Sequence, residues 1–243
     1  MEFQENLIRV KLFGAVELEN QWGHIVENRS RQPLPWLLLK YLLANRHREV
    51  SQVELMEKLW PDRPDSPDGN TGRVRLRRLR DLLNPLRLGG TKGLVLFSAG
   101  MYAINPEYDI LTDADAFSAL MLQIRQCPVE DPVGLKLCAD AIGLMRSPYM
   151  EFTRNASWAE EFRAAYRREF CGLAQDTMNR IITLEHDEVL PLLCRRAAQI
   201  APNEESLHRA IIGYLVARKR EIEVVRHVAA LSGAGADWLN SET

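Results

Sequence analysis

Five arginines stand within the eight positions 73–80, and this spacing suits the binding of an anion. They are Arg73, Arg75, Arg77, Arg78 and Arg80. No carboxylate precedes Asp81 in this run, so the guanidinium groups repel one another unless an anion lies alongside them. The phosphate backbone of a nucleic acid is such an anion. The alternative interpretation is an ordinary solvated helix face rich in arginine.

Residues 70–83 have the period of a helix with one apolar stripe. At about 100° per residue, the stripe consists of Gly72, Leu76, Leu79 and Leu83. Val74 lies roughly opposite, among the arginines, where its side chain buries nothing in a monomer. A small apolar group there suits the methyl group of thymine, while the neighbouring guanidinium groups can reach guanine edges or phosphates. The pattern therefore predicts a recognition helix that reads DNA.

The outward face of this helix divides into two groups of candidate DNA-binding residues. Those expected to contact phosphates, and so to supply salt-dependent affinity, are Arg73, Arg77 and Arg80. Those expected to read bases are Val74, Arg75 and Arg78. Asn70 and Thr71 lie on the same face at the start of the helix.

Strands and two helices precede the arginine helix. Alternation of apolar and polar residues predicts short antiparallel strands over 7–13 and 16–19. Prolines at 33 and 35 mark the start of a helix that ends near 45–48. A second helix begins at Ser51, whose side chain can cap it, and Glu54 three residues later completes a capping box.

A hairpin follows the arginine helix, which Pro85 ends. Two short apolar runs, 94–98 and 101–105, are separated by Ala99-Gly100 and predict two antiparallel strands. Strands, three helices and a hairpin, in that order, are typical of a winged helix. In that fold the second and third helices form the helix-turn-helix and the hairpin is the wing.

Several motifs of this half resemble those of a known family. They are Leu38-Leu39-x-Tyr41-Leu42-Leu43, Val50-Ser51-x-x-Glu54-Leu55, Leu59-Trp60-Pro61, Val74-x-x-x-Arg78-Leu79-Arg80-x-Leu82-Leu83 and Gly100-x-Tyr102. Together they resemble the OmpR-type winged helix of the antibiotic regulatory proteins, the SARP family of bacterial transcriptional activators. The resemblance covers roughly Val10 to Asn105.

The resemblance implies a way of docking on DNA. It places six residues against the major groove and its phosphates, namely Asn70, Thr71, Val74, Arg75, Arg77 and Arg78. It also brings the hairpin tip, Ser98 to Gly100, towards the neighbouring minor groove. Two departures stand out: Gly72 replaces an apolar core residue, which weakens the helix by about 1 kcal/mol relative to alanine, and Ser98-Ala99 lacks the arginine often found at the wing tip.

The second half of the chain has helical spacing almost throughout. The expected helices are roughly 113–126, 131–146, 155–183, 187–200, 203–218 and 220–231, with prolines at or near their ends. The spacing of small and large residues from Ala197 to Leu215 resembles a tetratricopeptide unit. Behind this winged helix, the segment resembles the bacterial transcriptional activator domain of the same family, most closely at Trp158-Ala159-Glu160-Glu161-Phe162-Arg163.

The expected fold is thus mainly α with a small β component. A winged helix-turn-helix domain over 1–107 is followed by an all-α, tetratricopeptide-like domain over 112–243, with the junction within 106–111. The net charge of −2 argues against a general polyanion binder. The charge is unevenly divided, since residues 1–106 hold 16 Lys and Arg against 12 Asp and Glu. A basic surface is therefore expected in the first half.

No signal for secretion or for chemistry is found. The acidic start lacks a signal peptide, and the most apolar run, 34–44, is about half a membrane span, so we expect a cytoplasmic protein without membrane contact. The cysteines at 127, 138, 171 and 194 lack metal-ligand spacing and are expected to be reduced core residues. Nucleotide-binding and hydrolase motifs are absent, so the sequence predicts no enzyme, no catalytic residue, no cofactor and no metal.

Two hypotheses for the function follow. The first is a sequence-specific DNA-binding activator whose partners are double-stranded DNA, with RNA polymerase and a second copy of the chain as candidates. One winged helix covers too little sequence for genomic specificity, so two protomers on repeated half-sites are expected. The second hypothesis is a protein-interaction adaptor that keeps the winged helix as a scaffold. Val74 among five arginines favours the first, because an adaptor gains nothing from such a face.

Overall fold

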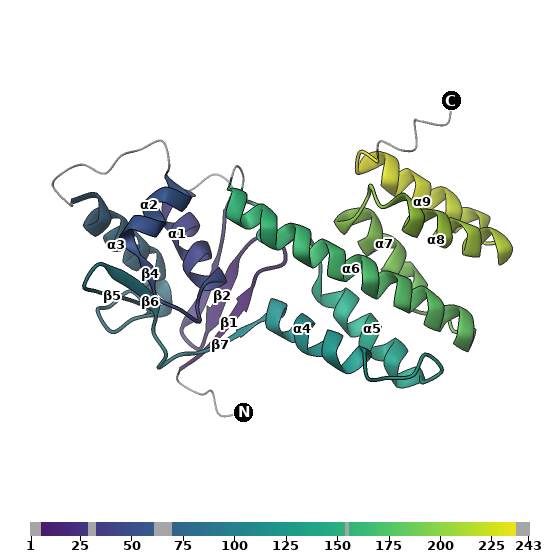
Figure 1. Cartoon of the computed structure of the whole chain (residues 1–243), viewed down its shortest axis with the longest axis horizontal. Coiled ribbons are helices and arrows are strands. Elements are labelled where there is room, and N and C mark those ends of the chain that lie inside the picture. The colour runs from purple at the N-terminus through teal and green to yellow at the C-terminus, as the bar shows by residue number, and fades with distance from the viewer. Residues whose placement is uncertain (1–5, 29–32, 61–69, 154–155, 237–243) are drawn as a thin grey trace. The chain divides into compact units, whose positions relative to one another are not determined.

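The computed structural model describes residues 6–28, 33–60, 70–153 and 156–236, as Figure 1 shows, and at Pro33 and residues 70–72 it describes the backbone without the side chain. Backbone contacts divide the chain into two compact units. The first comprises Met1–Asp113 and Met150–Glu160, and the second comprises Ala114–Tyr149 and Glu161–Thr243. Every described strand belongs to the first unit, and the second is built of helices. The prediction of a mainly α fold with a small β component, in which the strands come first, is confirmed.

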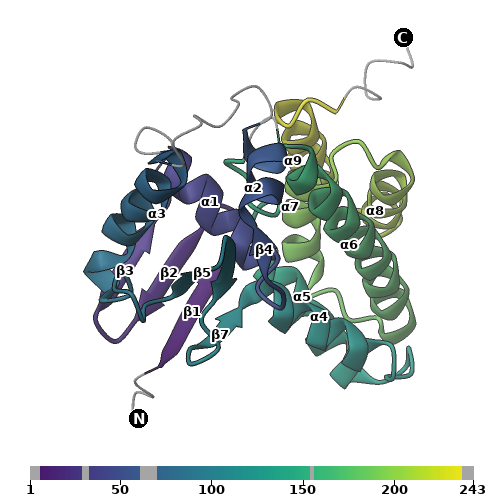
Figure 2. The ribbon, with the colours of Figure 1, turned by 60° about the vertical axis from the view of Figure 1, so that its left-hand side comes forward.

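A four-stranded sheet opens the first unit. Its strands are β1 (Leu7–Lys11), β2 (Glu17–Asn20), β3 (Gly23–Val26) and β7 (Asp109–Thr112), and they lie side by side in the order β3-β2-β1-β7, as Figure 2 shows. The two strands expected from the alternation are present and antiparallel. Strand β7 pairs in parallel with β1, with Leu7 opposite Asp109. Residues 109–111, expected within the domain junction, are therefore part of the sheet of the first unit.

Three helices and a hairpin complete this unit. They are α1 (Pro33–Ala44), α2 (Gln52–Leu59), α3 (Asn70–Leu83), a 3₁₀ turn over Asn84–Leu86, and the strands β5 (Val95–Ser98) and β6 (Met101–Ile104). A two-residue strand, β4 (Val50–Ser51), pairs with β6 and gives the sheet order β4-β6-β5. The core side chains of α1, which include Leu38, Leu39 and Leu43, are almost fully buried. The element order matches the one expected of a winged helix.

A buried ion pair ties α1 to the edge of the first sheet. Lys40 Nζ lies 2.5 Å from Glu27 Oε1, and both side chains are nearly inaccessible to solvent. Glu27 Oε2 accepts a hydrogen bond of 3.4 Å from the backbone N–H of Val16. Because both charges are removed from water, the loss of either partner leaves an uncompensated buried charge.

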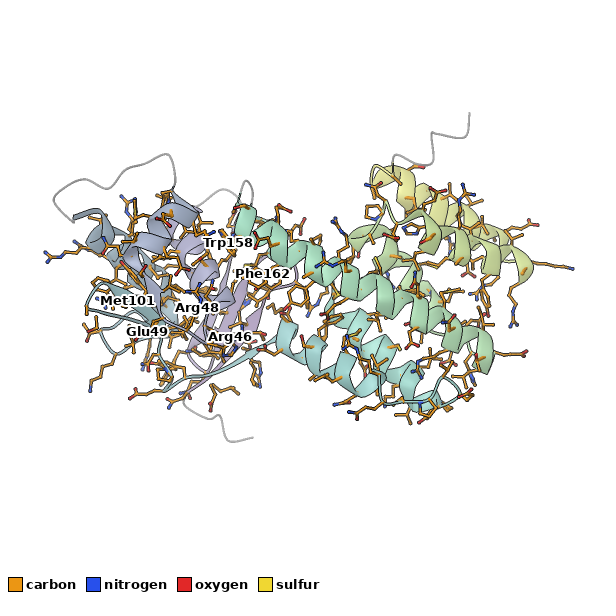
Figure 3. All side chains as sticks on the ribbon, in the orientation of Figure 1. Arg46, Arg48, Glu49, Met101, Trp158 and Phe162 are labelled. Atoms are coloured by element: carbon orange, nitrogen blue, oxygen red, sulfur yellow. The ribbon has the colours of Figure 1, made fainter. Side chains whose placement is uncertain are left out.

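A segment distant in sequence returns to the first unit. The backbone N–H of Met150 donates to the carbonyl oxygen of Leu12 at 2.7 Å, and that of Glu151 donates to Gly14 at 3.1 Å. Trp158, labelled in Figure 3, packs edge-on against Tyr41 of α1 with ring centroids 5.0 Å apart. The first unit is therefore discontinuous in sequence.

The second unit consists of paired helices. They are α4 (Asp113–Ile124), α5 (Pro132–Leu144), α6 (Ser157–Leu184), α7 (Leu190–Ile200), α8 (Glu205–Ala217) and α9 (Glu221–Gly233), of which α4 begins and α6 crosses at the boundary with the first unit. Each lies within three residues of its expected bounds, because apolar periodicity and the prolines at 132 and 191 mark the ends.

Asp113 accepts hydrogen bonds from the backbone N–H groups of Leu12 and Phe13 at 2.7 and 3.2 Å, a contact that its position at a helix start did not predict.

Among the described residues of the second unit, Arg180 of α6 is the largest fully buried side chain. Its guanidinium group donates to the carbonyl oxygens of Ile124, Cys127 and Pro128 and to Asp176 Oδ2, at 2.7–3.3 Å. A side chain at Gly134 would collide with this guanidinium group, since an added Cβ would lie against Nη1. Arg180 therefore fixes the turn between α4 and α5 from within the core.

Two histidines share a hydrogen bond between α8 and α9. His208 Nδ1 lies 3.0 Å from His227 Nε2, and His208 Nε2 lies 2.9 Å from the carbonyl oxygen of Ala201. Because that oxygen only accepts, His208 Nε2 carries the proton and Nδ1 accepts from His227 Nε2–H. His227 Nδ1 is buried without a hydrogen-bond partner among the described residues.

Candidate nucleic-acid interface

Helix α3 carries the arginines at the bounds that the sequence predicts, Asn70–Leu83. Its apolar stripe is buried, with Leu76, Leu79 and Leu83 among the core residues, and the helix packs against α1. The stripe forms because spacings of three and four residues bring these leucines to one side of the helix. Among the described residues, the opposite side of α3 is exposed.

The outward face combines exposed guanidinium groups with an exposed apolar side chain. Arg73, Arg77 and Arg78 are exposed, and Val74 is 41% exposed between them. This is the arrangement expected from the helical wheel. The side chains of Asn70 and Thr71, also expected on this face, lie outside the described residues.

Arg75 has a contact that the sequence analysis did not foresee. Its guanidinium carbon lies 3.9 Å from the centroid of the Trp60 ring, and Nη1 approaches Met56 Sδ. A guanidinium group over an indole face gains cation–π attraction, which is stronger when both groups are partly desolvated. The half-buried Arg75 is therefore held against residues at and beyond the end of α2, while Arg77 and Arg78 extend from the exposed face.

A cationic cavity lies along the flank of α3 that is opposite to Arg75. It has a volume of about 420 Å³, and its lining includes Arg73, Arg77, Arg80, Asn84 and Gly89, with Asp81 as the carboxylate that opposes the three arginines. The three arginines are spaced by four and three residues, so they share one side of the helix. Arg80 is half-buried, and its Nε is buried without a hydrogen-bond partner among the described residues. The three residues assigned to phosphates from the sequence therefore face one cavity.

The loop after α3 closes tightly on the end of the helix. A Cβ atom added at Gly89 would lie 2.2 Å from the carbonyl oxygen of Arg80 and 2.2 Å from Asn84 Oδ1, so no side chain fits there. Arg87 has a φ of 58°, and its guanidinium group lies 3.8 Å from the centroid of the half-exposed Trp22 ring. This pairing of Arg87 with Trp22 depends on the turn between β2 and β3, which brings the indole ring to the loop.

The hairpin β5–β6 is the segment that the sequence predicts to be a wing. Its turn consists of Ala99 and Gly100, both with positive φ, 50° and 79°, which suits the two-residue turns that join antiparallel strands. Ser98 is exposed at the end of β5, directly before this turn. Phe97 and Tyr102 pack with ring centroids 4.6 Å apart. The hairpin thus has Ser98 and Gly100 at its tip.

A polar network fixes the helix before α3. Ser51 Oγ caps α2 by accepting from the backbone N–H of Glu54 at 3.0 Å, as predicted. The Glu54 carboxylate was expected to complete a capping box, but it accepts instead from Tyr41 Oη at 2.6 Å and from Arg48, labelled in Figure 3, at 2.5 and 2.9 Å. The Arg48 hydrogen bonds lower the pKa of Glu54. Burial, and then the hydrogen bond to Glu54, raise the pKa of Tyr41 to about 12.

Comparison with solved structures adds an independent observation. The fold is similar to that of EmbR. The structure of Mycobacterium tuberculosis EmbR in complex with a low-affinity phosphopeptide covers 94% of this chain and 69% of EmbR, at 16% sequence identity and a TM-score of 0.54. No protein-family model and no curated protein matches the sequence. At this identity the similarity to EmbR shows the fold and nothing of the chemistry.

The described residues form neither a metal-binding cluster nor a helix that could span a membrane. Among the described residues, no group of three or more His, Cys, Asp and Glu side chains is placed to hold a metal ion. Asp187, which follows His186 in the segment before α7, forms an ion pair with Arg220 at 2.5 Å, so its carboxylate already has a cationic partner. The four cysteines are free, and burial raises the pKa of the Cys138 and Cys194 thiols to about 11. No helix within the described ranges has the length and hydropathy needed to cross a membrane.

Proposed function

We propose that this protein is a sequence-specific, DNA-binding transcriptional regulator of the SARP kind, and that it activates transcription. The observation that carries the proposal is the outward face of α3, where the exposed Val74 stands among exposed arginines. The similarity of the fold to that of EmbR supports it. In this proposal Met1 to Glu107 is the winged-helix domain and residues 112–243 form the activator domain.

The residues of α3 take separate roles on DNA. Arg77, with Arg73 and Arg80 around their shared cavity, neutralises backbone phosphates and supplies affinity that falls with salt. Val74 and Arg78 read base edges in the major groove. Asn70, Thr71 and Arg75 contribute on the same side, Arg75 after leaving the Trp60 ring. Ser98 and Gly100 at the wing tip approach the adjacent minor groove.

The helical unit supplies protein contacts. Its proposed partners, in the cytoplasm, are RNA polymerase and a second protomer. The second protomer is proposed because a single winged helix covers too few base pairs for genomic specificity. Two protomers on half-sites about one helical turn apart extend the sequence that is read.

Selection of bound sequences from random duplex DNA tests this function. We expect the wild type to enrich a repeated motif, and Arg77→Ala/Arg78→Ala to enrich none. Both arginines are exposed, so the variant is expected to fold. The matched control is Arg167→Ala/Arg226→Ala, which removes two equally exposed charges from the second unit and should enrich the wild-type motif. Absence of any enrichment by the wild type at low salt would contradict DNA reading and favour the adaptor hypothesis.

A further inference from the structure

A second cavity lies within the helical unit, apart from the proposed DNA face. It has a volume of about 570 Å³ and is walled by α4, the turn that follows α4, and α6. Small-molecule sites usually have volumes of about 300 to 1,000 Å³. The cavity is therefore large enough for a small ligand.

The inner wall of the cavity is apolar. Met121 and Ile124 of α4 and Leu173 of α6 line it, and each is almost fully buried. Burial of an apolar ligand surface against such a wall gains about 25 cal/mol per Å² removed from water. This wall therefore favours a ligand with an apolar body.

The rim of the cavity carries an excess of positive charge. Arg125 and Arg168 line it, both are exposed, and no ion pair is described for either guanidinium group. Of the two carboxylates on the lining, Asp176 is neutralised by Arg180 at 2.9 Å, which leaves Glu169 as the opposing charge. The rim therefore favours an anionic group over a neutral or cationic one.

Hydrogen bonds of Arg180 hold the back of the cavity in place. Arg180 uses four of its five N–H donors on Asp176 and on the carbonyl oxygens of the turn after α4. The side of its Nη1 is covered by Gly134. Arg180 thus positions the wall of the cavity, and the anion site at the rim belongs to Arg125 and Arg168. Because the wall is fixed by hydrogen bonds within the protein, a ligand orders few groups there.

Gly172 leaves room on the α6 wall. A Cβ added at this position meets no atom within 4 Å, so the space beside it is open. A larger side chain can therefore occupy the cavity without disturbing the helix.

From these features we propose that the cavity between α4 and α6 binds a small carboxylate with an apolar body. The apolar part lies against Met121, Ile124 and Leu173, and the carboxylate pairs with Arg125 and Arg168 at the rim. The site is separate from the DNA face of α3, and the proposal does not depend on DNA binding.

Calorimetric titration of the full chain with octanoate tests the site. Octanoate should bind saturably with a stoichiometry of one. Octylammonium, which has the same apolar chain and the opposite charge, should bind at least tenfold more weakly, because it faces the guanidinium groups. Equal binding of the two compounds, or no saturable binding of octanoate, would overturn the proposal.

Two variants locate the binding. Gly172→Leu fills the cavity and should abolish the titration, whereas Gly213→Leu, at an equally open glycine on α8, should bind octanoate as the wild type does. Arg168→Gln should weaken binding about three- to fivefold, in line with one solvent-accessible ion pair. Thermal unfolding of each variant in the absence of octanoate separates a loss of binding from a loss of folding. Undiminished binding by a folded Gly172→Leu protein would place octanoate elsewhere and refute the assignment.

Discussion

His227 donates its Nε2 proton to His208 Nδ1 across 3.0 Å, in a part of the second unit where both rings are closed to solvent. The hydrogen bond requires a neutral His208 ring, because Nε2 of that ring already donates to Ala201 and Nδ1 must accept. Burial lowers the pKa of His208, and burial with the neighbouring His208 lowers the pKa of His227 to about 4.

The first prediction concerns pH. Both histidines bind protons more readily in the unfolded chain, near pH 6.5, than in the folded one. Their contribution to stability is therefore complete above pH 6.5 and is lost as the pH falls towards 4. We expect the free energy of unfolding to drop by on the order of 2 kcal/mol between pH 7 and pH 5. Urea titrations at both pH values measure it. His227→Gln, which retains a donor to His208, should show a smaller drop, and an equal drop would contradict the assignment.

The second prediction concerns the buried pair of Lys40 and Glu27. Lys40→Met leaves the Glu27 carboxylate buried beside an apolar side chain, and we expect a loss of about 3–5 kcal/mol in unfolding free energy at pH 7. The double variant Lys40→Met/Glu27→Gln removes both charges and should recover part of this loss. Equilibrium denaturation gives both values. A loss below 1 kcal/mol in the single variant would mean that the pair is solvated.

The third prediction separates base reading from phosphate binding on α3. Arg78→Ala should cost on the order of 1–3 kcal/mol at the preferred DNA site and relax specificity at one base pair. Arg77→Ala should weaken binding to all sequences alike and reduce the salt dependence by about one phosphate contact. Competition assays over a salt series distinguish the two. Identical specificity profiles for Arg78→Ala and the wild type would refute the reading role.

The fourth prediction concerns the loop after α3. Gly89→Ala forces a Cβ against the Arg80 carbonyl and Asn84, and should lower stability by about 1–3 kcal/mol. It should also weaken DNA binding, since Arg80 and Asn84 line the cationic cavity. Gly90→Ala is the control, because its Cβ meets nothing within 4 Å. The melting temperatures of the two variants test this prediction. Equal melting temperatures would show that the loop accommodates the added methyl group at Gly89 without loss of stability.

The helices could be predicted from sequence because their signals are local. The leucine stripe of α3 and the cap at Ser51 depend on residues three or four positions apart, and both are as expected. Strand β3, strand β4 and strand β7 went unpredicted. Each is short, and β7 is a strand because it pairs with β1, where Asp109 lies opposite Leu7, a residue far away in the sequence. The four residues of β7 alone therefore give only a weak signal for a strand.

At the candidate site too, the features that depend on local sequence could be predicted, and the contacts between distant elements could not. The exposure of Val74 and of Arg78 follows from helical geometry, which the sequence determines. The side-chain contacts of Arg75 with Trp60, of Arg87 with Trp22 and of Glu54 with Arg48 depend on neighbouring elements, and they were not foreseen. Whether these side chains touch DNA stays a prediction.

The pairing of β1 with β7, and of Leu12 with Met150, bears on how the protein is made and how it can be divided. During synthesis the first sheet lacks its β7 edge until residue 112 has left the ribosome, and the Met150 contact comes later still. Contacts so distant in sequence slow folding. A fragment ending at residue 107 would expose the edge of β1 to pairing with other chains. A soluble DNA-binding fragment should therefore retain the chain through Glu160.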